Sequence, residues 1–108
     1  MALIELRVYD VLPGRMPALH QRFANITTKM FAKHEIKIVG YWENIIGTSN
    51  QLIYMVEWES LAERERKWGA FQVDPEWIAA RAQTEASGPI VAKVTNSIMA
   101  PTSYSPMR

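Results

Sequence analysis

The sequence contains no cysteine. This absence excludes disulfide bonds, thiol nucleophiles and metal sites built from thiolates. It says little about the compartment, because a chain without cysteine folds in reducing and oxidising surroundings alike.

An excess of one charge sign is also absent, because 12 Lys and Arg side chains face 11 Asp and Glu side chains, for a formal net charge of +1. A nucleic-acid-binding protein needs a concentrated basic face that displaces counterions from phosphates. We therefore expect no nucleic-acid partner. The glycines are isolated turn residues, so no glycine-rich phosphate loop is expected either.

Long apolar runs are missing as well. No stretch approaches the roughly 20 apolar residues of a membrane span. The N-terminal segment has Glu5 and Arg7 inside its apolar residues, unlike the uninterrupted core of a signal peptide. We expect a cytoplasmic protein with no membrane span.

Histidine is scarce, since His20 and His34 are the only two. Both fall on one expected helix, fourteen residues or about four turns apart, so one chain cannot direct both at one metal ion. For His20, a surface or boundary position is favoured over a haem ligand. The sequence predicts no metal site and no bound cofactor.

Among the features that are present, an alternating pattern predicts a first strand from Ala2 to Val11. A helix is then predicted from Arg15 to about His34, because apolar residues recur at steps of three and four. We expect this stripe to cover a sheet. Its members are Met16, Leu19, Phe23, Ile26, Met30 and Phe31.

A β-hairpin is predicted next, with strands over residues 36–46 and 51–58 around the turn cluster 47–50. Both strands carry apolar side chains on both faces, which a sheet with one wet face would not. A single helical layer covers only one face, so the other face predicts a partner. The apolar residues are Val39, Tyr41, Trp42, Ile45 and Ile46, then Leu52, Ile53, Tyr54, Met55, Val56 and Trp58.

The chain is organised around residues 60–75. A capping box of Ser60 and Glu63 opens a helix there, and Asp74-Pro75 ends it and starts another. That second helix should run to about Ala86 with Trp77, Ile78 and Ala82 inward, and the charged residues Arg64, Arg66 and Lys67 should be solvated. A last strand is predicted over residues 90–99.

The element order predicts an α+β fold, a ferredoxin-like βαββαβ domain with a four-stranded antiparallel sheet and helices on one face. We expect residues 1–100 to form this single domain and residues 101–108 to form a C-terminal arm. An uncovered apolar face marks an interface. We therefore expect a homodimer in which two sheets pack face to face.

Several short motifs, in order, resemble the NIPSNAP family over Ile4 to about Ile98. They are residues 4–9, 12–14, 39–42, 46–47 with 50–51, 61–65 and 74–77. The resemblance implies a dimeric α+β barrel whose bacterial members mostly have no assigned reaction. Related barrel families include cofactor-independent monooxygenases and haem-handling proteins.

Three polar side chains, Glu5, Arg7 and Tyr9, share one face of the first strand. As a pocket wall, Arg7 would bind a carboxylate or phosphate and Tyr9 would donate to the ligand. Alternatively, Arg7 pairs with Glu5 or Glu57 and keeps this face satisfied at the dimer contact.

The hairpin adds aromatic and acidic candidates. Trp42 and Tyr54 would wall a flat aromatic ligand, although core packing explains them equally well. Glu43 and Glu57 are expected to lie close to opposite each other, either sharing a proton or each taking Arg7, Lys93 or water as its partner. The candidate ligand-binding residues are Glu5, Arg7, Tyr9, Trp42, Glu43, Tyr54 and Glu57, and no catalytic residue is assigned.

Two functions remain open at this stage. The first is a barrel that binds a small aromatic or anionic ligand on the inner sheet face, with a cofactor-independent oxygenase or isomerase as its enzymatic form. The second is a structural or protein-interaction module without a ligand. A cavity of about 300 Å³ or more, lined by Glu5, Arg7, Tyr9 and the hairpin aromatics, would favour the first.

Overall fold

The computed structural model describes residues 3–107. Met1 and Ala2, expected to begin the domain, and Arg108, expected to end the arm, lie outside the described residues. The elements in chain order are β1 (Leu3–Val11), α1 (Met16–Arg22), η1 (Phe23–Thr27), α2 (Thr28–Lys33), β2 (Lys37–Glu43), β3 (Gln51–Trp58), α3 (Leu61–Gln72), α4 (Pro75–Thr84) and β4 (Val91–Met99).

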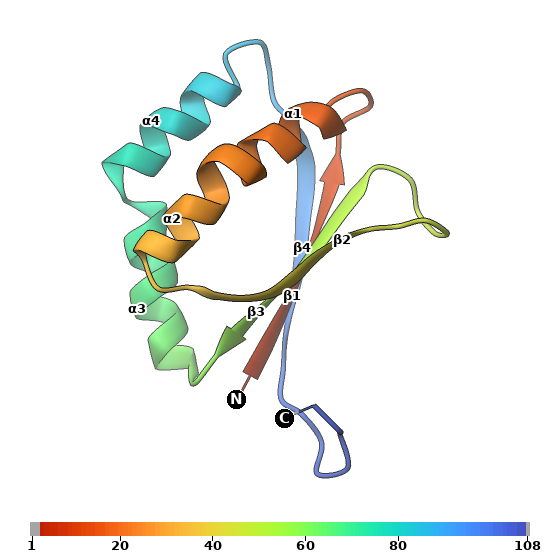
Figure 1. Cartoon of the computed structure of the whole chain (residues 1–108), viewed down its shortest axis with the longest axis vertical. Helices are drawn as coiled ribbons and strands as arrows, with labels where there is room; N and C mark the ends of the chain where they lie inside the picture. The colour runs from red at the N-terminus through yellow and green to blue at the C-terminus, as the bar shows by residue number, and fades with distance from the viewer. Residues whose placement is uncertain (1–2, 108) are drawn as a thin grey trace.

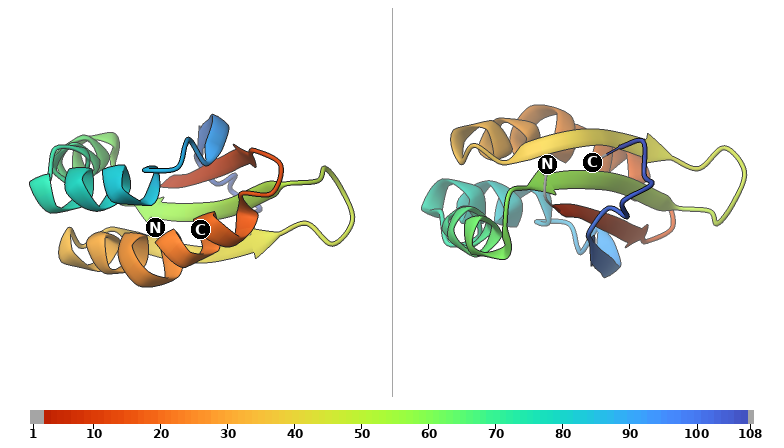
Figure 2. Two further views of the ribbon diagram at one scale, coloured as in Figure 1. Left: turned by 90° about the horizontal axis from the view of Figure 1, so that it is seen from above. Right: turned by 90° about the horizontal axis from the view of Figure 1, so that it is seen from below.

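The four strands form one antiparallel sheet in the order β2-β3-β1-β4. The helices lie on one side of this sheet, with α1, η1 and α2 forming one row and α3 and α4 the other (Figures 1 and 2). The predicted ferredoxin-like α+β fold is confirmed. No helix of residues 3–107 lies on the other side of the sheet.

The strand register decides which side chains face the helices. Arg7 lies opposite Tyr54 of β3 and Asn96 of β4, so these three side chains share the helix-covered face. Leu6 lies opposite Met55 on the other face, which we call the open face. The alternation of β1 is thus confirmed, and its polar side turns toward the helices.

The hydrophobic core fills the space between the helices and the sheet. Tyr54, Val56 and Trp58 of β3 are almost completely buried there, against Phe31 of α2. Burying each large apolar side chain contributes about 1.5–3 kcal/mol, so this one-sided core accounts for most of the stability.

The first helix has the predicted extent but contains a π-helical segment, Phe23–Thr27. The amide of Thr28 donates to the carbonyl of Phe23, five residues earlier. Such a segment widens the helix locally and is frequent at functional sites. Here it faces the pocket described below.

The predicted caps of the next two helices are confirmed with one difference. Ser60 Oγ accepts from the Glu63 amide at 3.1 Å, and Asp74 Oδ1 accepts from the Glu76 amide at 2.9 Å. The Glu63 carboxylate accepts from the amide of Glu59 instead of that of Ser60. Ile78, expected inward, is 52% exposed because α4 turns that side chain outward.

The hairpin differs from its prediction in length and register. The connection spans residues 44–50, and an irregularity between Ile38 and Gly40 shifts the pairing of β2 with β3. Glu43 pairs with Leu52 at one end of the ladder, and Glu57 pairs with Lys37 at the other. The expectation that the two carboxylates lie nearly opposite each other is wrong.

Candidate functional site

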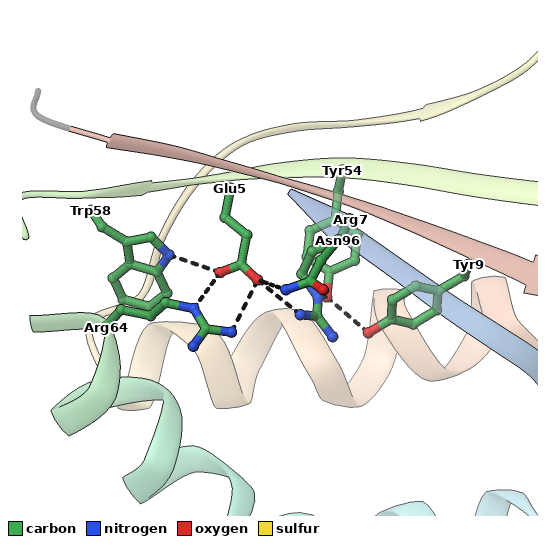
Figure 3. Close-up of polar contacts among 7 residues, drawn as sticks. All are labelled: Glu5, Arg7, Tyr9, Tyr54, Trp58, Arg64 and Asn96. Carbon is green, nitrogen blue, oxygen red and sulfur yellow. Dashed lines mark hydrogen bonds and ion pairs between the residues drawn. The ribbon is translucent and has the colours of Figure 1, made fainter. Parts of the chain in front are cut away.

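A buried carboxylate, that of Glu5, is the centre of the polar face of β1. Its side chain is fully buried and accepts hydrogen bonds at both oxygens from groups on β1, β3, β4 and α3 (Figure 3). The donors are Trp58 Nε1 (3.0 Å) and Arg64 Nε (2.7 Å) at Oε1, and Arg7 Nη1 (3.0 Å), Arg64 Nη2 (3.1 Å) and Asn96 Nδ2 (2.9 Å) at Oε2.

Burial alone would raise the pKa of Glu5. The hydrogen bonds from Arg64, Asn96 and Trp58 and the charge of Arg7 overcome that effect and lower the pKa to about 2. Glu5 is therefore ionised and saturated with donors at neutral pH. It positions its neighbours and is not available as a base, which fits the predicted Arg7–Glu5 ion pair.

Arg7 carries the network from Glu5 toward two tyrosines. Its Nε donates to the hydroxyl of Tyr54 at 2.8 Å, and that hydroxyl lies 2.8 Å from the hydroxyl of Tyr9. The guanidinium also lies over the ring of Trp68, 4.5 Å from its centroid. Burial disfavours the charged form, but Tyr54, Tyr9 and Glu5 outweigh it, so the pKa of Arg7 is raised.

The direction of the hydrogen bond between the tyrosines follows from donor counting. Tyr54 is fully buried and already accepts from Arg7, so its own hydrogen can be satisfied only by donation to Tyr9. Tyr9 then accepts, and its hydrogen is free to donate elsewhere. Burial, together with the neighbouring Tyr9, raises the pKa of Tyr54 well above its ordinary value, which keeps this proton in place.

Tyr9 and Arg7 line a pocket between the helices and the sheet, with a volume of about 190 Å³. We call it the helix–sheet pocket. All of its charged lining residues are arginines, and most of the others are aromatic or aliphatic. The lining residues are Arg7, Tyr9, Arg22, Phe23, Thr27, Phe31, Trp68, Phe71, Gln72, Trp77, Arg81, Val91 and Val94.

Two polar atoms of the pocket residues have no hydrogen-bond partner within residues 3–107, Arg22 Nε and Thr27 Oγ1. Their residues are only 5% and 2% exposed. A buried polar group without a partner costs about 1–3 kcal/mol, so it calls for an explanation. Burial also lowers the pKa of Arg22.

Four of the seven predicted site residues therefore come together: Glu5, Arg7, Tyr9 and Tyr54. They lie beneath the helices and not on the open face, where a barrel interior was expected. The pocket is also smaller than the expected 300 Å³. The polar side of β1 lies beneath the helices, where it finds partners on α3 and β4 of the same chain.

Trp42 and Glu43 belong to a different groove, of about 420 Å³, between β2 and the first helix. Glu43 pairs there with His20, and both side chains are about half exposed. Phe23 lines this groove as well as the helix–sheet pocket. Glu57 joins neither site, because its carboxylate pairs with Lys37 at 2.8 Å.

Sequence reasoning missed several residues of the site. Arg64 was expected in solvent, yet its guanidinium binds Glu5 through two nitrogens. Arg22 was not singled out, although it sits among the apolar residues of the first helix. An arginine directly before the buried Phe23 was the one available signal.

Metal and membrane features were searched over the same residues. Among residues 3–107, no group of three or more His, Asp or Glu side chains is placed to hold a metal ion. No helix in that part of the chain has both the length and the apolar character to cross a membrane.

The fold defines the class of protein, a ferredoxin-like α+β domain. The chain belongs to the NIPSNAP family, whose model matches residues 4–106. The family predicted from the short motifs is thus confirmed. No curated protein matches the chain.

Solved structures agree with this assignment. A NIPSNAP family protein from Agrobacterium tumefaciens is 25% identical, with a TM-score of 0.88 and all of both chains covered. An uncharacterized NIPSNAP-like domain protein from Burkholderia xenovorans is 26% identical, with a TM-score of 0.85 over 96% of this chain and 88% of that one.

A more distant structure shares the fold alone. It is a putative antibiotic biosynthesis monooxygenase from Chloroflexus aurantiacus, 14% identical, with a TM-score of 0.60 and 97% of each chain covered.

Proposed function

We propose that this protein binds a small molecule in the helix–sheet pocket and works as a homodimer. The observation that carries the first part is the pair of unpartnered buried atoms, Arg22 Nε and Thr27 Oγ1, in residues that line one pocket. Neither atom is exposed to the pocket in this structure, so a bound molecule would satisfy them once the two side chains turn toward it. Without one, the fold carries a cost that an apolar core would avoid.

The pocket walls support this proposal because they combine aromatic faces with few polar groups. Trp68 and Phe71 of α3 and Trp77 of α4 form one wall, in which the Phe71 ring lies 5.1 Å from that of Trp68 and 4.8 Å from that of Trp77. Ligand sites characteristically join such apolar walls to a small number of placed donors. Helices from both rows contribute lining residues, so the pocket depends on the whole fold.

The arrangement favours binding over acid–base catalysis. Glu5 is ionised and fully hydrogen-bonded, and the raised pKa of Tyr54 keeps its proton at neutral pH. Neither group is poised near the working pH, as a general base would be. A protein-interaction module, the other predicted function, gives no reason for unpartnered polar atoms beneath the helices.

The homodimer is supported by the open face of the sheet. Ile53 and Met55 of β3 and Val8 of β1 point to this face, which no helix covers. The molecule measures 46 × 36 × 19 Å, flatter than a compact domain of this length. A second copy stacked on the open face would bury these side chains.

The binding proposal can be tested with small molecules of up to about 10 non-hydrogen atoms in a thermal-shift screen, since a cavity of about 150 Å³ already holds benzene. Val94 lines the pocket and is 42% exposed, so Val94→Trp should occupy part of the space. Val39→Trp is the matched control, because Val39 is similarly exposed (38%) but lies on β2, outside this pocket.

We expect compounds that raise the melting temperature of the wild type and of Val39→Trp but not of Val94→Trp. A screen without any such compound contradicts the binding proposal.

The homodimer can be tested by sedimentation. Met55→Lys, on the open face, should give a monomer at micromolar concentration, whereas Ile78→Lys, on the exposed side of α4, should leave the dimer intact. A wild-type monomer at that concentration contradicts the dimer.

A further inference from the structure

Positive charge around the helix–sheet pocket exceeds the negative charge that pairs with it. Glu5 is shared by Arg7 and Arg64. Glu85 is likewise shared by Arg22, at 3.9 Å, and Arg81, at 3.5 Å. Within the described chain these four arginines form ion pairs with no other carboxylate, so four guanidinium groups face two carboxylates.

Of these four arginines, Arg22 has the weakest pairing with a carboxylate. This side chain is 5% exposed, its Nε has no partner within residues 3–107, and its contact with Glu85 is long. A desolvated guanidinium is stabilised by a carboxylate that accepts from it in a forked geometry. Arg22 is the pocket group with the most to gain from an incoming anion.

Neutral donors lie beside it. Thr27 Oγ1 is unpartnered, and Tyr9 keeps a free hydroxyl hydrogen because Tyr54 donates to it. Both residues line the same pocket as Arg22. An acceptor-only group such as a carboxylate could take a hydrogen from each of the three, whereas a cation or a pure donor would leave Arg22 Nε without a partner.

The size of the pocket limits the rest of the ligand. An apolar cavity of about 150 Å³ holds one benzene ring. The helix–sheet pocket, at about 190 Å³, has room for one ring and a carboxylate between walls that include Trp68 and Trp77. Two fused rings or a nucleotide would exceed it.

We infer that the ligand is a compact monocarboxylate with a single ring or a similar apolar body, its carboxylate held by Arg22, Thr27 and Tyr9. This inference rests on the proposed function, because it names the ligand class of the same pocket.

The test is calorimetric titration of the full chain at pH 7 with benzoate and with benzamide, which differ in charge but hardly in shape. Arg22→Gln removes the guanidinium, and Arg66→Gln removes an exposed arginine of α3 as the control. Charge-assisted hydrogen bonds predict that benzoate binds about tenfold or more tightly than benzamide. Arg22→Gln should abolish the preference, and Arg66→Gln should retain it.

Circular dichroism of Arg22→Gln confirms that the variant is folded, and Thr27→Val gives a second test of the same contact. Equal binding of benzoate and benzamide, or a preference that survives in Arg22→Gln, overturns the carboxylate assignment and leaves the pocket proposal standing. The carboxylate assignment is likewise overturned, and the pocket proposal stands, if neither benzoate nor benzamide binds but other compounds bind and Val94→Trp prevents their binding. If no compound depends on Val94, the carboxylate inference and the proposed function fall together.

Discussion

Glu5 and Arg64 are joined by two hydrogen bonds, of 2.7 and 3.1 Å, that fasten the first strand of the sheet to helix α3. The carboxylate is fully buried, and the side chain of Arg64 is one-quarter exposed. The same carboxylate binds Arg7 and so orients the row that leads to Tyr9. This contact couples the stability of the fold to the geometry of the helix–sheet pocket.

Replacing that carboxylate should be strongly destabilising. Glu5→Gln leaves the guanidinium groups of Arg7 and Arg64 without their shared counter-charge, and breaking a buried ion pair costs about 3–5 kcal/mol. We expect a loss of that size in the free energy of unfolding measured by urea denaturation. Glu65→Gln removes an exposed carboxylate of α3 and should cost less than about 0.5 kcal/mol. Equal effects of the two variants would mean that Glu5 contributes nothing through burial.

The lowered pKa of Glu5 predicts how stability depends on acid. The folded pKa is about 2 and the ordinary value is 4.5, so this stability is fully present above pH 4.5 and is lost as the pH falls toward 2. The difference corresponds to about 3 kcal/mol. Asp74 adds to the loss in acid, because hydrogen bonds from Lys33 and His34 lower its pKa.

Glu5→Gln separates the two contributions to the pH dependence of the free energy of unfolding. The variant keeps the contribution of Asp74 and lacks that of Glu5. Urea denaturation at several pH values between 2 and 6 should show the two proteins converging as the pH falls. Parallel profiles would contradict the assignment.

The link between Arg7 and Tyr9 can be tested with tyrosine-to-phenylalanine changes. Tyr54→Phe removes the acceptor of Arg7 Nε and the donor to Tyr9, at an expected cost of about 1–3 kcal/mol. Tyr41→Phe, on the same face of the hairpin, removes a hydroxyl that bonds to nothing within residues 3–107 and should be nearly neutral. Chemical denaturation measures both. A neutral Tyr54→Phe would contradict the hydrogen-bonded row.

Arg22 should reduce stability while it serves binding. Arg22→Met keeps a long apolar side chain and removes a buried guanidinium whose Nε has no partner. Glu85, the carboxylate left behind, is 27% exposed and still pairs with Arg81, so the change should be neutral or slightly stabilising, within about 1 kcal/mol. We expect the ligand-free variant to melt at or above the wild-type temperature and to lose ligand-induced shifts. Calorimetric melting with and without ligand measures both effects. A large destabilisation of Arg22→Met would show that Arg22 supports the fold.

Most of the fold was predictable from the sequence, because local signals agreed with one another. The alternation of β1, the cap at Ser60 and the Asp74-Pro75 boundary each specified an element that the structure contains. The hairpin register was not predictable, since the irregularity at Ile38 and the connection over residues 44–50 have no clear sequence signature. Glu43 and Glu57 would lie apart in either register, because Glu43 pairs near the start of β3 and Glu57 lies near its end.

The candidate site was only half predictable for a different reason. Periodicity groups Glu5, Arg7 and Tyr9 on one face but does not say whether helices cover that face. A polar face beneath helices requires partners from distant segments, here Arg64 and Asn96, and one sequence does not pair residues so far apart.

A crystal structure of the protein with the compound that gives the largest thermal shift tests the central claim most directly. The account predicts electron density for the compound between the helices and the sheet, within hydrogen-bonding distance of Arg22 or Thr27. Density on the open face of the sheet, or in the groove beside His20 and Trp42, would contradict it.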